Sequence, residues 1–262
     1  MADALFERRG DELVPSAITR GPWSPDALHG GPVAALLAGL AEALPRPGPM
    51  AAARITIELL RPVPLAPLRG DARVLRPGRK VMLAESSLHA GGSEVARATL
   101  LFVRTAALPL PAETHGGRAA PPPGPDTVLR TKPIWDAGLP AYHRDAVEHR
   151  VVRGVWGRPG PCTDWIRLRV PVVAGEETTP FQRVAAAADF GNGIGAALPY
   201  GEWRFINPDL TIHVARLPRG EWVCLDAVTW PEGEGIGLAE SELFDEHGRL
   251  GRSLQSLLLE KG

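Results

Sequence analysis

The chain has 262 residues, 44% hydrophobic and 23% charged, values that are ordinary for a globular protein with a sizeable core. A formal net charge of −1 gives no electrostatic basis for binding nucleic acid, and no apolar run reaches the ~18–20 residues of a membrane span. The two cysteines, Cys162 and Cys224, lack metal-ligand spacing and suit a reducing compartment, so we expect a cytoplasmic protein.

The first elements that the sequence predicts are one helix and four strands. Residues 33–44 (VAALLAGLAEAL) are rich in Ala and Leu, and Pro45 and Pro47 end the predicted helix. Because this segment is apolar on nearly every side, we expect it to be buried on most sides. Alternating stretches joined by Pro/Gly turns then predict antiparallel strands at residues 54–61, 70–75, 80–89 and 94–104.

A segment rich in proline and glycine follows, at residues 109–125, and it includes the run PPPGP. Such a segment forms neither a helix nor a central strand, so we predict a linker. It divides the chain into an N-terminal unit, residues 1–108, and a C-terminal unit, residues 126–262.

The C-terminal unit repeats the same order of elements. A leading hairpin is predicted within residues 148–171 and a helix at residues 180–194. Strands are predicted at residues 205–216, 221–230, 236–245 and 248–260. One buried helix followed by an antiparallel meander, present twice, predicts an α+β fold.

The repeat is also visible in the residues themselves. The tetrapeptide LAES occupies residues 83–86 and again residues 238–241, an offset of 155. At the same offset, Ile-Thr-Ile at 55–57 matches Leu-Thr-Ile at 210–212. We interpret the chain as one structural unit present twice, so differences between the copies point to a site.

Asp189 is the first such difference. It follows the apolar run Val-Ala-Ala-Ala-Ala in the second predicted helix. A buried carboxylate needs a partner or a shifted pKa, and desolvated acids in clefts are candidate bases. The alternative is a contact that caps the helix end, or a partly exposed turn, because Gly191 follows closely.

Two strand positions of the second unit also carry polar residues in place of apolar ones. Asn207 corresponds to Ala52, and Gln255 corresponds to Leu100. Taken singly, Asn207 fits a turn before Pro208 and Gln255 fits a strand edge. Their joint appearance with Asp189 in one copy indicates a functional site.

The first unit has its own distinctive segment, His29-Gly30-Gly31, at the start of its helix. Backbone N–H groups at a helix N-terminus favour anions, which predicts an oxyanion hole for a polarised carbonyl. A capping or packing role for His29 is the alternative. His143 and His149 fall in a polar connection, where we expect solvated surface rather than a metal site.

The order of these segments resembles the double-hotdog acyl-CoA thioesterases of the thioesterase II type. The resemblance covers nearly the whole chain except the linker. It implies a double hotdog, with two tandem units that each have a long helix wrapped by an antiparallel sheet. The similar segments are HGGP (29–32), RP (61–62), RPG (76–78), ADF (188–190), NPD (207–209) and DEHGRL (245–250), which leads to Gln255.

The resemblance also implies an activity, the hydrolysis of acyl thioesters with acyl-CoA as the expected partner. In that family an Asp on the second helix, a Ser or Thr on the next strand and a Gln on the last strand hold the attacking water. The matching residues here are Asp189, Asn207 and Gln255, with an amide in place of the usual hydroxyl. The expected roles are Asp189 as general base and residues 29–31 as carbonyl donors, without a metal or cofactor.

Two alternatives stay open. A hotdog hydratase or dehydratase acting on enoyl thioesters needs a histidine beside Asp189, and His213 is a sequence candidate. A protein that binds acyl thioesters without catalysis is the other. Arg61, Arg76 and Arg79 are candidates for the CoA phosphates. The paired units permit a monomer, and a homo-oligomer is equally compatible with the sequence.

Overall fold

The computed structural model describes residues 3–262 except 112–113, 115–119 and 132–137. Its first half confirms the predicted helix and four strands and adds a short leading hairpin that the sequence patterns did not predict. The elements are β1 (Phe6–Arg9), β2 (Glu12–Pro15), the turn η1 (Ala17–Thr19), α1 (Gly30–Glu42), β3 (Met50–Leu59), β4 (Leu68–Arg76), β5 (Val81–Ala90) and β6 (Ser93–Arg104).

The second half has a matching order of elements. Strands β11 and β12 begin and end 155 positions after β4 and β5, the offset of the LAES repeat. The elements are η3 (Pro125–Thr127), η4 (Tyr142–Ala146), β7 (Val147–Arg153), β8 (Cys162–Leu168), α2 (Pro180–Ala188), α3 (Gly191–Ile194), β9 (Trp203–Ile206), β10 (Asp209–Val214), β11 (Val223–Pro231), β12 (Ile236–Asp245) and β13 (Gly248–Lys261).

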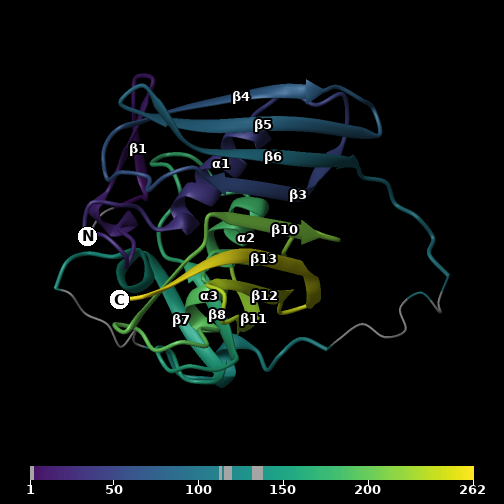
Figure 1. Ribbon diagram of the computed structural model, residues 1–262. Coiled ribbons are helices and arrows are strands. Elements are labelled where there is room, and N and C mark those ends of the chain that lie inside the picture. The colour runs from purple at the N-terminus through teal and green to yellow at the C-terminus, as the bar shows by residue number, and fades with distance from the viewer. Residues whose placement is uncertain (1–2, 112–113, 115–119, 132–137) are drawn as a thin grey trace.

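The described strands form one antiparallel sheet of 13 strands (Figure 1). Its order is β1-β2-β4-β5-β6-β3-β10-β13-β12-β11-β8-β7, and β9 pairs separately with β13. The strands of the first half therefore lie next to one another along the sheet, and those of the second half follow them. The proposed linker, residues 109–125, follows β6 and lies partly outside the described residues.

The two halves meet at the pair of strands β3 and β10. Thr56 lies opposite Thr211, and Ile55 and Ile57 lie opposite Ile212 and Leu210. The two threonine hydroxyls are 3.5 Å apart. Thr56 and Thr211, which the 155-residue offset relates, thus face each other at the centre of the sheet, and the antiparallel pairing crosses the residues on either side of them. Each half therefore presents the same strand to the other.

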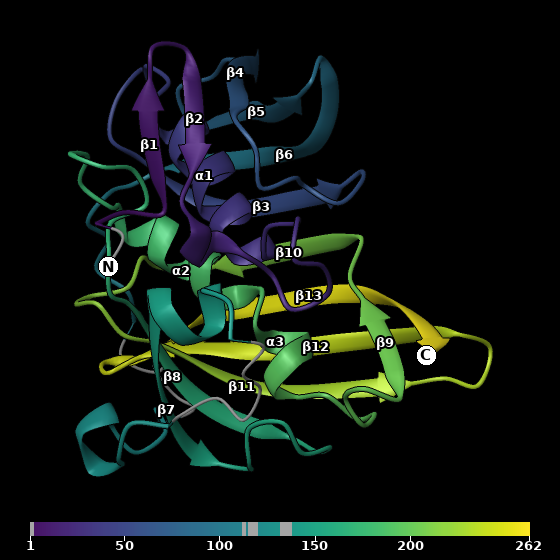
Figure 2. The same ribbon diagram turned by 90° about the vertical axis from the view of Figure 1, so that its left-hand side faces the viewer.

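Helices α1 and α2 lie together on one face of the sheet (Figure 2). They have 13 and 9 residues, so the long helix predicted for each unit is not found. The predicted helix at residues 180–194 is wrong in its second half, because the chain leaves α2 at Asp189 and forms the separate short helix α3. Glycines at 191 and 193 disfavour helix continuation here.

The strand predicted at residues 205–216 is also interrupted. Pro208 has no N–H for the ladder, so β9 ends at Ile206 and β10 begins at Asp209. The carbonyl of Pro208 instead accepts a hydrogen bond from the Leu59 N–H at 2.7 Å. The break frees Asn207 from strand pairing and directs its side chain toward the helices.

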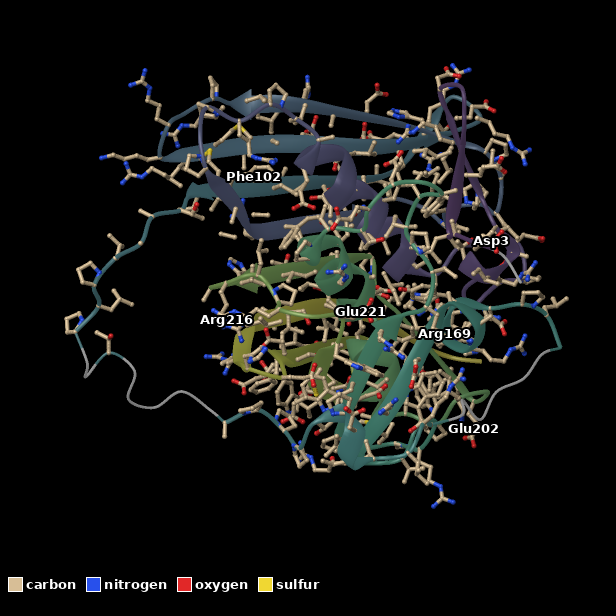
Figure 3. All side chains as sticks on the ribbon, turned by 180° about the vertical axis from the view of Figure 1, so that it is seen from behind. Asp3, Phe102, Arg169, Glu202, Arg216 and Glu221 are labelled. Carbon is tan, nitrogen blue, oxygen red and sulfur yellow. The ribbon has the colours of Figure 1, made fainter. Side chains whose placement is uncertain are left out.

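The helices and the sheet face enclose one large apolar core. Leu36, Leu37 and Phe181 from the helices and Ile55 and Phe102 from the strands are almost completely buried. Charged residues such as Glu202 and Arg216 lie toward opposite ends of the second half (Figure 3). None of the helices in the described part of the chain is long and apolar enough to cross a membrane.

Candidate active site

The candidate site forms where the N-terminus of α1 meets the C-terminus of α2. His29 is the N-cap of α1, and Asp189 is the C-cap of α2. A Cβ atom on Gly30 would lie 2.6 Å from both carboxylate oxygens of Asp189. Glycine is therefore required at position 30 if the carboxylate is to approach the helix end this closely.

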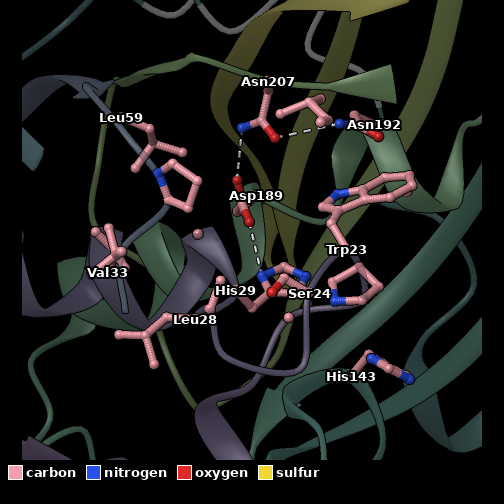
Figure 4. A pocket seen from close by; sticks show the side chains of 18 of the residues that line it. Trp23, Ser24, Leu28, His29, Val33, Leu59, His143, Asp189, Asn192 and Asn207 are labelled. Atoms are coloured by element: carbon pink, nitrogen blue, oxygen red, sulfur yellow. Dashed lines mark hydrogen bonds and ion pairs between the residues drawn. The ribbon is translucent and has the colours of Figure 1, made fainter. Parts of the chain in front are cut away.

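Three side chains contact the Asp189 carboxylate, and Figure 4 shows two of them, Asn207 and His29. The Asn207 Nδ2 donates to Oδ1 at 3.0 Å, and the Gln255 Nε2 donates to the same oxygen at 3.3 Å. The His29 Nδ1 lies 2.8 Å from Oδ2. The structure thus brings together the four predicted side chains, one from the first half of the chain and three from the second.

This carboxylate is buried, and its surroundings favour the ionised form. Burial by itself raises the pKa of Asp189, but the charge of His29 and the hydrogen bonds from His29, Asn207 and the Gly31 N–H outweigh it. The pKa of Asp189 is consequently lowered from its ordinary value. The group is ionised throughout the neutral range.

The ring of His29 connects the helix end to the carboxylate. Its Nδ1 lies 3.0 Å from the Gly31 N–H as well as 2.8 Å from Asp189. A single ring nitrogen accepts from Gly31 when unprotonated and donates to Asp189 when protonated. The other ring nitrogen points toward the side where Trp23 lies (Figure 4).

The three residues of the predicted oxyanion segment, His29, Gly30 and Gly31, do not all face the cavity. Gly30 and His29 line the cavity in front of Asp189, whereas Gly31 does not. A Cβ atom on Gly31 would lie 2.6 Å from the Ala186 carbonyl and 2.8 Å from the Tyr142 ring. Gly31 therefore allows the two helices to approach, and its N–H is directed at His29 and Asp189 rather than into the cavity.

Asn192 is a site residue that the sequence patterns did not reveal. Its backbone N–H donates to the Gln255 Oε1 at 2.9 Å, which leaves the Gln255 Nε2 facing Asp189. The Asn192 side chain donates to the Phe205 carbonyl at 3.2 Å and lies 3.4 Å from the Asn207 Oδ1. The sequence shows only an asparagine between two glycines at this position, and that pattern fits the end of a helix as well as it fits a site.

A cavity of about 340 Å³ opens in front of the carboxylate. Its polar lining includes His29, Asp189, Asn192 and Asn207, and also Ser24, Arg61 and His143. Gln255 does not line the cavity but contacts Asp189. The rest of the wall is mainly apolar and includes Leu28, Val33, Leu59, Val63, Trp156, Phe190 and Ile206. A few convergent polar groups in an apolar cavity are typical of a site for a small molecule with an apolar part.

The exposed histidine connection expected from the sequence is wrong, because His143 and His149 are both buried. His143 lines the cavity, and His149 pairs with the buried Asp164 at 2.6 Å. The ring of His149 packs against Phe190 and Trp156, two residues of the cavity wall. Side chains from β7, β8 and η4 thus pack around the site.

The arginines named from the sequence fall in different places. Arg61 lines the cavity, but Arg76 and Arg79 belong to the β4–β5 turn. That turn lies beside Met50 and Arg104, at the other end of β3 from Leu59. The hydratase candidate His213 is an exposed residue of β10 and has no contact with Asp189 in the described structure.

The chain is similar to structures of the hotdog class. A conserved protein of unknown function with a hot dog fold from Alicyclobacillus acidocaldarius is 17% identical over 99% of this chain and 97% of its own, with a TM-score of 0.76. The acyl-CoA thioesterase II TesB2 from Mycobacterium marinum is 17% identical over 90% of both chains, with a TM-score of 0.65. These likenesses define the fold.

Sequence profiles identify the family. Residues 19–103 match the profile described as the acyl-CoA thioesterase N-terminal domain, and residues 118–259 match that of the acyl-CoA thioesterase C-terminal domain. No curated protein matches the chain significantly. The chain belongs to the acyl-CoA thioesterase family, an enzyme class that hydrolyses thioesters.

Proposed function

We propose that the protein hydrolyses acyl-CoA to a carboxylic acid and a free thiol by direct attack of water activated by Asp189. The observation that carries this proposal is a buried, ionised carboxylate at the wall of an apolar cavity, contacted by the side chains of His29, Asn207 and Gln255. Among the described residues, no serine or cysteine side chain forms a hydrogen bond with this carboxylate.

In the proposed reaction, Asp189 removes a proton from water as the water oxygen attacks the thioester carbonyl carbon. The tetrahedral intermediate then collapses, the C–S bond breaks, and the thiolate leaves and takes up the proton that Asp189 removed from water, which restores the ionised carboxylate. The amides of Asn207 and Gln255 do not titrate, so they hold the carboxylate in one orientation through the proton transfer.

Negative charge develops on the carbonyl oxygen during attack. Gly30 lies at the N-terminus of α1 and lines the cavity, so we assign its N–H and the positive end of the helix dipole to that oxygen. Gly31 is omitted from this role because its N–H is directed at His29 and Asp189. The site is then composite, with the base from one half and the carbonyl donor from the other.

The variant Asp189→Asn tests the proposal. It keeps the size of the side chain but removes the base, so we expect kcat for acyl-CoA to fall by about 10²–10⁴-fold. Thiol release with a coloured thiol reagent measures turnover, and calorimetry with a non-hydrolysable acyl-CoA thioether measures binding, which should persist. Asp209→Asn is the matched control, because Asp209 accepts from the Ser256 N–H outside the cavity. Near wild-type turnover in Asp189→Asn would exclude Asp189 as the base.

One observation favours a second candidate. A hydratase for enoyl thioesters needs an Asp–His pair. No histidine lies near Asp189 in the sequence, but His29 lies beside it in the structure. A 2-enoyl-CoA substrate separates the two reactions. Release of free thiol supports hydrolysis, whereas loss of the enoyl absorbance without thiol release supports hydration. Binding without either change supports a non-catalytic role.

A further inference from the structure

A second cavity of about 680 Å³ lies next to the one that contains Asp189. The two cavities have six lining residues in common, Gly21, Pro22, Trp23, Ser24, His143 and Tyr200. The rings of Trp23 and Tyr200 stack with their centroids 6.0 Å apart and so form part of the shared wall. A ligand long enough to pass this wall reaches both cavities.

The charge of the second cavity differs from that of the first. Arg20, Arg144 and Arg204 line it, and no Asp or Glu side chain is among its lining residues in the described part of the chain. Arg144 is paired with Asp145 at 3.0 Å, so its charge is compensated. Arg20 and Arg204 have no carboxylate partner among the described residues.

Arg20 is held in place by backbone carbonyls. Its Nε donates to the Pro25 carbonyl at 2.6 Å, and its Nη1 donates to the Pro140 carbonyl at 2.6 Å. It is only half exposed, so its charge is partly shielded from water. A fixed guanidinium without a counterion is suited to a phosphate, because little side-chain entropy remains to be lost on binding.

Arg204 approaches the cavity from a different element, β9, and is exposed. β9 follows directly after Tyr200 and leads to Asn207, so the strand joins the cationic cavity to the catalytic one. The end of β9 near Glu202 lies at the outside of the molecule (Figure 3). A polyanion can therefore enter from solvent while the group attached to it extends inward.

We infer that this second cavity binds the phosphate-bearing nucleotide end of the CoA thioester, with Arg20 and Arg204 as the phosphate contacts. The inference rests on the proposed hydrolysis of acyl-CoA and adds a location for the CoA part of the substrate. The apolar cavity at Val33, Leu59 and Phe190 then takes the acyl chain, and the thioester lies between the two at His29 and Asp189. A volume of about 680 Å³ lies within the range of cavities that hold ligands of this size.

The test compares two substrates with the same acyl group, acyl-CoA and acyl-pantetheine, the second of which carries no phosphate. For Arg204→Gln and Arg20→Gln we expect KM for acyl-CoA to rise about tenfold, with kcat little changed. KM for acyl-pantetheine should not change. Raising the ionic strength should reduce the difference between wild type and Arg204→Gln, because screening weakens exposed charge contacts.

Two controls keep the result interpretable. Arg76→Gln removes a charge at the distant β4–β5 turn and should leave both KM values unchanged. Arg20→Lys retains the charge if Arg20→Gln fails to fold. The Arg204 side chain is exposed, so its loss should leave the fold intact. Equal effects on both substrates, or none on acyl-CoA, would overturn the inference. Absence of turnover with either substrate in the wild type would instead contradict the proposed hydrolysis.

Discussion

At the scale of single residues, each oxygen of the Asp189 carboxylate has its own donors. Oδ2 faces His29, whereas Oδ1 receives the amides of Asn207 and Gln255. Asn207 and Gln255 were recognisable because the other copy has apolar residues at the aligned strand positions, and Asp189 because it follows an apolar run. The pairing of His29 with Asp189 was not, because it depends on how two distant helix ends meet.

Asn207→Ala removes one donor that lowers the pKa of Asp189, so we expect that pKa to rise. Hydrolysis requires the ionised carboxylate, and the acid limb of kcat/KM should therefore move to higher pH. We also expect kcat to fall by about 10- to 100-fold, because the carboxylate loses its fixed orientation. A pH–rate profile measures both effects.

Asn207→Thr serves as the comparison. Threonine retains a donor and is the kind of residue that the thioesterase II resemblance places at this position. Its acid limb should stay closer to that of the wild type. If the limb of Asn207→Ala does not move, Asn207 does not set the ionisation of Asp189.

At the scale of elements, the two helices meet at both of their ends. At one junction His29 of the α1 cap contacts Asp189 after α2. At the other, the Thr179 hydroxyl at the α2 cap donates to Glu42 of α1 at 2.5 Å. In the first half, the positions that correspond to Asn207 and Gln255 are the buried apolar residues Ala52 and Leu100. The His29–Asp189 junction therefore forms the candidate site, whereas we expect the Thr179–Glu42 junction to stabilise the fold.

Thr179→Ala tests the stabilising junction. Thr179 and Gln182 form a capping box, in which each side chain satisfies the backbone N–H of the other. Loss of an N-cap hydroxyl should lower the free energy of unfolding by about 1 kcal/mol. Urea unfolding measures the change, and Thr179→Ser should restore most of it. An unchanged unfolding midpoint in Thr179→Ala would show that the cap is not needed.

At the scale of the whole molecule, Asp245 links the loop after β10 to the turn between β12 and β13. Its fully buried carboxylate accepts two hydrogen bonds from Arg216, at 2.5 and 2.6 Å. It also accepts from the backbone N–H groups of Arg219 and His247, both at 2.9 Å. Burial raises the pKa of Asp245, but these partners outweigh it, and the pKa is lowered.

Asp245→Asn should lower the free energy of unfolding by about 3 kcal/mol at neutral pH, because Arg216 loses its partner. A carboxyl with a lowered pKa stabilises the fold above its unfolded pKa of about 3.9, and this stabilisation is lost as pH falls through the folded value. The difference in stability between wild type and variant should therefore begin to narrow only below about pH 3.9 and disappear only below the folded pKa. Urea unfolding at pH 7 and at a series of pH values below the unfolded pKa measures the difference. A gap that is independent of pH would contradict this assignment.

The accuracy of the strand predictions also has a physical basis at this scale. Seven of the eight predicted meander strands have the expected order, and six of these agree with the expected bounds within two residues, since period-two alternation is a local property of a half-buried strand. Residues 205–216 failed because the alternation continues across Pro208 although the hydrogen-bonded ladder does not. The hairpin of β1 and β2 was missed because strands of four residues carry little periodic signal.

The sequence by itself determined the α+β plan, the offset of 155 between similar strands, and the identity of Asp189, Asn207 and Gln255 as unusual polar residues. These properties depend on neighbouring residues or on a comparison of the two copies. Only the tertiary structure decided that His29 pairs with Asp189, that Asn192 fixes Gln255, and that His149 is buried. Those contacts join segments far apart in the chain, and packing of the two helices on one sheet, rather than local propensity, brings them within hydrogen-bonding distance.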